Sequence, residues 1–257
     1  MPEPIRAVDR ALNVLLCFSR DTPELTMTQI AEKVGLNKST VHRLLATLEG
    51  KRFIKRDPIT NLYKLGIRMF QMAYLTMEAN DLRKLASPYL DCLCEQHGEN
   101  VNLAVLDGHD VLYLDVHESP KRVKLAASVG QRLPAFSTAS GKVILAYLPV
   151  EEVRRILSFG MPQQTQYTIT SSDTFIESLD LIRQQGFAIS TQEYEESINA
   201  IAAPILDSKG NPVGSISIAG PTYRLSQEKM IEISPTILEV ARELSNEIKL
   251  IDTLALK

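Results

Sequence analysis

The sequence predicts an α+β protein of two parts: a small helical unit that ends in a two-stranded wing, and a larger antiparallel sheet flanked by helices. Three observations support this. The 257 residues are enough for two domains. Apolar residues recur at helical spacing in the first part of the chain. Further on, two pairs of apolar runs flank the turn sequences "LDGHD" and "DSKGN", as in β-hairpins.

Two helices are predicted at the start of the chain. Residues 5–18 ("IRAVDRALNVLLCF") form the first, whose core-facing stripe comprises Val8, Leu12, Leu15 and Leu16. Residues 25–35 form the second, whose short apolar face comprises Ile30, Ala31 and Val34. Gly35 is suited to end this helix because glycine adopts the left-handed conformation without steric cost.

A third helix is predicted from Asn37 to Gly50. The Asn37 side chain can accept the N–H of Ser39 or Thr40 and so cap the helix. The inward face comprises Val41, Leu44, Leu45 and Leu48. The outer side near the N-terminus then carries Lys38, Ser39, His42 and Arg43. A helix that exposes hydroxyl, imidazole and guanidinium groups while burying leucines suits insertion into a DNA major groove.

Residues 51–66 ("KRFIKRDPITNLYKLG") predict a wing of two short strands around a basic tip. The first strand places Phe53 and Ile54 before Lys55 and Arg56. The chain turns at Asp57-Pro58, and the second strand then carries Leu62, Tyr63 and Leu65.

The rest of the chain predicts a further helix and a second domain. Residues 66–79 carry many apolar side chains, so this helix is expected to bury against a partner subunit or the second domain, or to be an ordinary core helix. Strands are expected at 101–106, at 111–116 and on both sides of "DSKGN". Helices are expected at 81–96, 140–148, 150–158, 173–185 and 227–250. This order gives an antiparallel sheet with helices on its faces.

The net charge of −3 conceals an asymmetry along the chain. Residues 1–64 hold 11 Lys/Arg against 7 Asp/Glu, whereas the rest holds 17 against 24. Within residues 36–64 the counts are 7 and 2. A basic unit joined to an acidic one indicates a polyanion as the partner of the first unit, the alternative being a merely solvated basic face.

Composition indicates a cytoplasmic protein. Hydrophobic residues make up 44% and charged residues 23% of the chain, as in soluble globular proteins. No apolar run approaches the ~20 residues of a membrane-spanning helix, and the first residues lack the apolar core of a signal peptide. Cys92 and Cys94 are too close for an easy mutual bridge, which favours a reducing compartment. No membrane partner is expected.

No enzymatic motif is predicted in "STASGK". A phosphate-binding loop needs a glycine where Phe136 stands and a hydroxyl where Val143 stands, and a Ser-x-x-Lys pair needs serine where Ala139 stands. Gly141 is instead expected to permit close packing at a helix start. Lys142 is expected to be structural or adjacent to a ligand. The chain is therefore not expected to be an enzyme.

Metal and cofactor sites are not expected either. Cys92 and Cys94 could bind a metal ion together with His97 and either His109 or His117. However, the side chains of two cysteines that are two residues apart on a helix point about 200° away from each other. Three acidic residues lie close together in the sequence: Glu193, Glu195 and Glu196. They are interpreted as solvated surface residues, so no acid–base chemistry is predicted for them. Four histidines and no tryptophan give no cofactor signature.

Three stretches narrow the interpretation to one family. They are "GENVNLAVLDGHDVLYLDVHES", "GQRLPAFSTASGKVILAYLP" and "QQGFAISTQEYEESINAIAAPILDSKGNPVGSISIAGP". In this order and at these separations they resemble successive landmarks of the IclR (isocitrate lyase regulator) family of bacterial transcription regulators. The resemblance extends from "RAVDRALNVLLCF" to the C-terminal helix.

This resemblance implies a winged helix-turn-helix at residues 1–65, a linker helix at 66–80 and a GAF-like effector-binding domain at 81–257. It implies a homodimer, or a tetramer, on partly palindromic double-stranded operator DNA, most often as a repressor. The effector would be a small organic acid or an aromatic metabolite of a catabolic pathway. The residues implied in DNA binding are Lys38, Ser39, Thr40, His42, Arg43, Lys55, Arg56, Thr60 and Asn61.

By the same resemblance, effector binding would involve Leu125, Thr138, Ala139, Ser190, Ile198, Ala200, Ser217 and Ala219. Two positions depart from the family pattern. Ser190 stands where many members carry aspartate, and Ala200 stands where they commonly carry cysteine. The loss of an anionic group and a thiol predicts a preference for a different acid or a less polar ligand.

A ligand-sensing module whose helix-turn-helix contacts another protein is the alternative. The concentration of basic residues around the third helix and the wing argues against it, because a protein-binding helix tends to show an apolar or mixed-charge face. A salt titration distinguishes the two, since DNA binding alone predicts steep counterion release.

Overall fold

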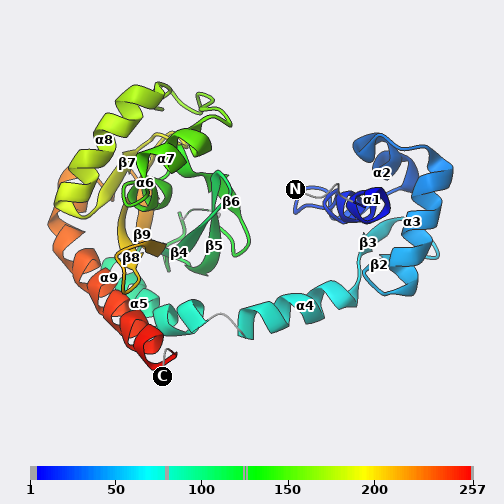
Figure 1. Cartoon of the computed structure of the whole chain (residues 1–257), viewed down its shortest axis with the longest axis horizontal. Coiled ribbons are helices and arrows are strands. Elements are labelled where there is room, and N and C mark those ends of the chain that lie inside the picture. Colours follow the sequence, from blue (N-terminus) through cyan, green and yellow to red (C-terminus); the bar gives the residue numbers. More distant parts are fainter. Residues whose placement is uncertain (1–4, 79–80, 124, 126, 256–257) are drawn as a thin grey trace. The chain divides into compact units, whose positions relative to one another are not determined.

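The computed structural model describes residues 5–78, 81–123, 125 and 127–255. The chain divides into two compact units, residues 1–80 and 81–257, and each is described by itself (Figure 1). Residues 79 and 80, the end of the predicted linker, lie outside the described part of the chain. None of the described helices is long and apolar enough to cross a membrane.

The first unit combines helices with a small antiparallel sheet. Its elements are α1 (Arg6–Leu15), β1 (Glu24–Leu25), α2 (Met27–Val34), α3 (Lys38–Gly50), β2 (Ile54–Arg56), β3 (Tyr63–Leu65) and α4 (Ile67–Glu78). The strands pair in the order β1-β3-β2. The predicted helices and both wing strands are confirmed. Strand β1 was not predicted, because two residues are too few to show an alternating pattern.

Local interactions define both ends of α2. Thr26 precedes the helix, and its Oγ1 accepts the N–H of Gln29 at 3.2 Å. The Gln29 side chain in turn accepts the N–H of Thr26 at 2.8 Å, which completes a capping box. Gly35 ends the helix at a φ of 64°, as predicted.

The cap of α3 is also the predicted one. Asn37 Oδ1 accepts the N–H of Thr40 at 2.9 Å and the hydroxyl of Ser39 at 3.0 Å. Replacing Asn37 with alanine is expected to lower the free energy of unfolding of the first unit by about 1 kcal/mol, because the first turn loses its acceptor. Urea denaturation followed by circular dichroism measures this. Asn37→Ser is the control, since serine caps equally well; an equal loss in both variants would contradict the capping role.

The first helix buries a different face from the predicted one. Val14 is fully buried, whereas Val8, Leu12 and Leu16 are 53%, 54% and 79% exposed. Leu15 is partly buried against the same core as Val14. The predicted stripe is therefore wrong for three of its four members. Apolar residues cover several faces of this helix, so spacing alone does not select the face that meets the core.

Apolar side chains are buried in the centre of the first unit but exposed on α4. The central core comprises Val14, Leu25, Ile30, Ala31, Val41, Leu45, Leu48, Ile54 and Tyr63. On α4, Ile67, Phe70 and Leu75 are more than 60% exposed. That this helix buries its apolar side chains against a partner remains a prediction.

The second unit is a six-stranded antiparallel sheet with helices on both faces. Its elements are α5 (Asp81–His97), β4 (Asn100–Asp107), β5 (Asp110–His117), β6 (Arg132–Pro134), a 3₁₀ turn (Ala135–Ser137), α6 (Ala139–Leu145), α7 (Val150–Leu157), α8 (Ser172–Gln185), β7 (Ala188–Thr191), β8 (Ile198–Leu206), β9 (Pro212–Pro221) and α9 (Gln227–Ala255). The predicted hairpins are β4-β5 and β8-β9. The α+β class is confirmed.

The sheet separates two cores. Its strand order is β6-β5-β4-β9-β8-β7. One core joins the sheet to α5 and α9, through residues such as Leu90 and Ile237. The other joins the opposite face to α6, α7 and α8, through residues such as Val143 and Phe175. Figure 1 shows α9 along the outer face and α6 on the other side of the sheet. The cavity described below opens on the α6 side.

Candidate functional site

The predicted DNA-contacting residues of α3 lie together at the start of this helix. Lys38, Ser39, His42 and Arg43 are exposed, whereas Thr40 is half-buried. Thr40 and Arg43 also border a largely apolar cavity of about 700 Å³ between α1 and α3. Arg43 thus lies beside apolar side chains of α1 and α3 and still reaches solvent, as long arginine side chains commonly do.

The side chain of Asp57 stabilises the turn at the tip of the wing. Asp57 Oδ1 accepts the backbone N–H groups of Ile59 and Thr60 at 2.8 and 2.9 Å. The N–H of Thr60, followed by that of Ile59, holds the pKa of Asp57 below its usual range. Lys55 and Thr60 are exposed on either side of this turn. The turn therefore presents them on a fixed backbone.

Arg56 and Asn61 contact each other within the wing. Arg56 Nη2 donates to Asn61 Oδ1 at 2.6 Å, and the guanidinium lies 5.6 Å from the ring centroid of Tyr63. Among the described ion pairs none joins Arg43 to Glu49 further along α3, and Glu49 instead accepts the backbone N–H of Arg56 at 3.3 Å. Arg43 is thus available to an external partner.

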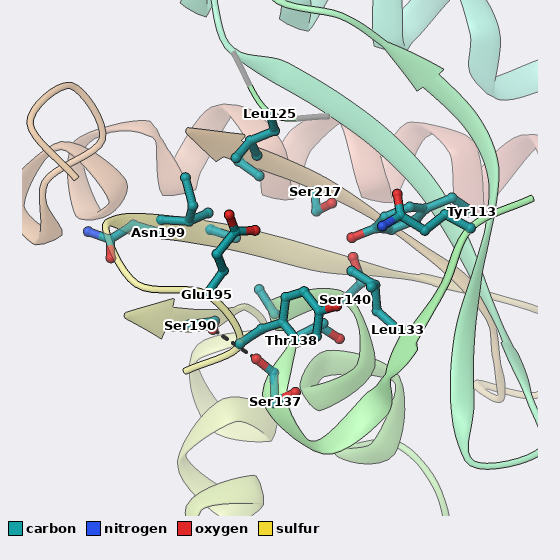
Figure 2. Close-up of a pocket in the computed structure, with 16 residues that line it drawn as sticks. Tyr113, Leu125, Leu133, Ser137, Thr138, Ser140, Ser190, Glu195, Asn199 and Ser217 are labelled. Atoms are coloured by element: carbon teal, nitrogen blue, oxygen red, sulfur yellow. Dashed lines mark hydrogen bonds between the residues drawn. The ribbon is translucent and has the colours of Figure 1, made fainter. Parts of the chain in front are cut away.

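The second unit contains a cavity of about 420 Å³ that all eight predicted effector-binding residues line. They are Leu125, Thr138, Ala139, Ser190, Ile198, Ala200, Ser217 and Ala219. Figure 2 shows labelled members of the set around one space, although they come from five separate stretches of the chain. Pairing of β8 with β9 sets Ala200 opposite Ala219, so small side chains leave room there. Their assignment to an effector remains a prediction.

One wall of the cavity is the turn into α6. Thr138 precedes the helix; its Oγ1 accepts the N–H of Gly141 at 3.2 Å and donates to the carbonyl of Pro134 at 3.2 Å. A side chain at Gly141 would collide with the backbone of Ala135, since a Cβ atom there would lie 2.1 Å from the Ala135 carbonyl oxygen. The predicted close packing at Gly141 is confirmed.

Several polar side chains also lie at the cavity. Ser190 Oγ donates to the carbonyl of Ser137 at 3.1 Å, and Asn102 Nδ2 donates to Ser217 Oγ at 3.3 Å. Ser137 Oγ is buried and lacks a hydrogen-bond partner within the described residues. Burial raises the pKa of the Tyr113 hydroxyl well above its usual value, so this group is a neutral donor. The cavity is thus rich in hydroxyl groups.

The interpretation of Glu193 as solvated surface is wrong. Its carboxylate is buried and lies 2.6 Å from Lys142 Nζ, which also donates to the carbonyl of Ile189 at 2.8 Å. Burial raises the pKa of Glu193, and Lys142 opposes this effect. The structural role expected for Lys142 is confirmed. Glu195, by contrast, is exposed and lines the cavity, and Glu196 is exposed.

The cysteines of α5 face different surroundings. Cys92 is exposed, whereas Cys94 is buried with its thiol 3.4 Å from the carbonyl of Glu118. Within the described residues, no group of three or more histidine, cysteine, aspartate or glutamate side chains is placed to hold a metal ion.

Each of the two units matches a known protein family. Residues 7–58 match the family described as the IclR helix-turn-helix domain. Residues 74–246 match the family described as the bacterial transcriptional regulator IclR C-terminal domain. The chain belongs to the IclR family. It is accordingly a DNA-binding transcription regulator under the control of a small-molecule effector.

IclR relatives resemble the chain over most of its length. The regulator BhcR of Paracoccus denitrificans is 34% identical over 94% of this chain and 86% of its own. Among solved structures, an IclR regulator from Alicyclobacillus acidocaldarius is 29% identical with a TM-score of 0.84, covering 95% of this chain and 99% of its own. An IclR homologue from Microbacterium hydrocarbonoxydans, solved in complex with 4-hydroxybenzoate, is 25% identical with a TM-score of 0.80, covering 95% and 98%.

Half of the residues that line the cavity are among those that the IclR motifs predicted, and half are not. The missed residues are Tyr113, Gln131, Leu133, Ser137, Ser140, Tyr194, Glu195 and Asn199. Tyr113 lies on β5 and faces the α6 side together with Val111. The alternation within β5 was a usable signal for it, since residues two apart on a strand share a face.

Proposed function

We propose that this regulator binds a partly palindromic operator as a homodimer or tetramer, through α3 and the wing, and that an effector in the 420 Å³ cavity controls this binding. The observation that carries the DNA proposal is the exposed cluster of hydroxyl and basic side chains at the start of a capped helix. The wing adds Lys55, Arg56, Thr60 and Asn61 beside it. Phosphate contacts would supply affinity, and base-edge contacts would supply sequence preference.

Arg43 is the proposed reader of a guanine, because its planar fork matches the O6 and N7 acceptors. Arg43→Ala is expected to weaken operator binding by roughly 1 to 3 kcal/mol and to relax the preference at one base position. Selection of bound sequences from a random DNA pool, followed by titration of the best site, measures both effects.

The matched control is Arg43→Lys, which keeps the charge but loses the bidentate geometry. It should retain the salt dependence of binding and still lose the base preference. An unchanged base preference in Arg43→Ala would contradict the reader assignment. A salt slope near zero in the unmodified protein would contradict DNA binding by this surface and favour the protein-contact alternative.

The cavity is the proposed effector site because the eight residues that the family pattern implies converge on it. Its volume is within the range of small-molecule sites. Control requires the effector to bind one arrangement of the protein better than another, since equal affinity for both would shift nothing. The largely exposed apolar helix α4 is the proposed element of transmission and subunit contact.

Repression is the proposed direction of control. One relative, 28% identical, is named a transcriptional repressor, and another, 31% identical, is named a transcriptional activator. A promoter fused to a reporter, with and without the regulator gene, directly measures whether the regulator represses or activates transcription.

We further propose a cytoplasmic location, where operator DNA is accessible. We also propose that the protein has no catalytic activity, because the relatives are named as regulators.

A further inference from the structure

A second pocket lies in the second unit, where the end of α5, the segment after β5 and the start of α9 meet. Its volume is about 250 Å³. The described lining contains three cations, Lys121, Arg224 and Lys229, and one carboxylate, Glu99. We call it the cationic pocket. It has no described lining residue in common with the 420 Å³ cavity, so it is a separate site.

The carboxylate of Glu99 is already neutralised from two sides. Glu99 is 4% exposed, and Arg224 Nε and Nη2 donate to its two oxygens at 2.6 and 2.7 Å. Lys121 Nζ donates to the same carboxylate at 2.9 Å. Burial acts to raise the pKa of Glu99, but the hydrogen bonds from Arg224 and Lys121 outweigh it and lower the pKa. One ionised acid therefore faces two cations, which leaves positive charge for a ligand.

The solvent side of the cationic pocket offers further donors. The side chains of Lys121 and Lys229 are 43% and 44% exposed, so an ion can reach both ammonium groups. Lys229 Nζ donates to Glu232 at 2.7 Å, and the Glu232 side chain is 68% exposed. An exposed pair of this kind is weak, and an ammonium group keeps donors after one such bond.

His97 adds a buried polar atom to the lining. Its Nε2 is buried and lacks a hydrogen-bond partner within the described residues. Burial, followed by the charge of Lys229, lowers the pKa of His97, so the ring is neutral near pH 7. A buried polar atom without a partner is costly, and a ligand that pairs with it removes this cost.

A small oxyanion meets these requirements. Its oxygens accept from ammonium groups in short, charge-assisted hydrogen bonds. A phosphate group that keeps one proton both accepts and donates, so it pairs with Nε2 of His97 in either tautomer. The start of α9 contributes the partial positive charge of a helix N-terminus. The pocket is smaller than sites for drug-sized ligands, which favours a compact ion.

Two hydrogen bonds connect the cationic pocket to the 420 Å³ cavity. Arg224 Nη2 donates to the carbonyl of Val123 at 2.8 Å, two residues before Leu125. Asn199 Nδ2 donates to the carbonyl of Leu225 at 2.8 Å. Leu125 and Asn199 line the cavity, whereas Arg224 and Leu225 line the cationic pocket. A ligand in the cationic pocket would therefore lie beside residues that hold the cavity wall.

We propose that the cationic pocket is a second ligand site, which binds a phosphate group between Lys121, Lys229 and His97. The phosphate is either the free ion or the phosphate group of a small monoester, because both lysines are on the open side. This site goes beyond the proposed function and does not depend on the effector cavity.

The test is isothermal titration calorimetry of the full-length protein in a phosphate-free buffer at constant ionic strength. The probes are inorganic phosphate and glycerol 3-phosphate. At least one is expected to bind at one site per chain with a Kd of about 1 mM or lower. Lys121→Gln and Lys229→Gln should each weaken this binding about tenfold, because each variant removes a charged donor. The matched control Lys209→Gln, in the exposed turn between β8 and β9 and outside the lining, should leave the Kd unchanged.

The two probes also distinguish the sources of the phosphate. Tighter binding of glycerol 3-phosphate would identify a monoester as the ligand, whereas equal or tighter binding of inorganic phosphate would identify the free ion. Circular dichroism establishes that the variants fold, and if one does not, the other carries the test. Binding that both pocket variants retain, or that Lys209→Gln weakens equally, would place the phosphate elsewhere and overturn the proposal. No binding of either probe at about 20 mM would overturn it as well.

Discussion

Replacing Gly141 with alanine is expected to lower the free energy of unfolding of the second unit by about 3 kcal/mol. The added Cβ atom would lie 2.1 Å from the carbonyl oxygen and 2.3 Å from the Cα atom of Ala135. These are backbone atoms, so no side-chain rotation relieves the collision, and the turn that carries Thr138 must shift. Urea denaturation followed by circular dichroism measures the loss.

Gly50→Ala is the matched control. Gly50 is the last residue of α3, and a Cβ atom built on it meets nothing within 4 Å. Its effect is expected to stay within about 1 kcal/mol, because alanine merely restricts the unfolded chain. A Gly141→Ala protein as stable as the unmodified one would show that the turn at Ala135 tolerates displacement. Its cavity would then be free to change shape around Thr138.

The elements that the sequence predicts well are those whose local signals agree. In α3 a capping asparagine, four inward apolar residues and a terminal glycine all indicate the same helix, and the structure has it from Lys38 to Gly50. In α1 the helix was correct but its buried face was not, because Val8 and Val14 are equally apolar and only the position of the other helices distinguishes them. Tertiary packing decides such cases.

The short edge strands show a second limit. Strands β6 and β7 span three and four residues at the two edges of the sheet, and neither was predicted. Strands of this length carry too few residues for alternation to be detected. They matter for the site nevertheless, because β7 supplies Ser190 and β6 supplies Leu133 to the cavity.

The burial of Glu193 depends on a residue distant in the sequence. Its partner Lys142 lies 51 positions earlier, and nothing in "QEYEES" reveals the pairing. A glutamate beside two other acids is ordinarily solvated, so local composition favoured the wrong environment. Contacts of this kind can be predicted from one sequence only when a motif specifies both partners.

Removing Lys142 should therefore have a larger effect than any surface charge change. Lys142→Met is expected to destabilise the second unit by about 3 to 5 kcal/mol, because the carboxylate of Glu193 is left buried and unpaired. The loss should grow with pH. Burial already raises the pKa of Glu193, and the variant lacks the cation that opposes this, so the pKa should rise further.

The sign follows from proton linkage. When the folded-state pKa of an acid exceeds its unfolded value, the folded state binds more protons between the two, and stability falls as pH rises through that interval. The penalty in Lys142→Met should accordingly be greater at about pH 8 than at about pH 5, measured by urea denaturation. The double variant Lys142→Met/Glu193→Gln removes both charges and should recover most of the loss, without the pH dependence. Equal losses at both pH values, or no recovery in the double variant, would mean that Glu193 finds solvent once its partner is gone, and that the segment carrying Tyr194 and Glu195 is not held against α6 by this pair.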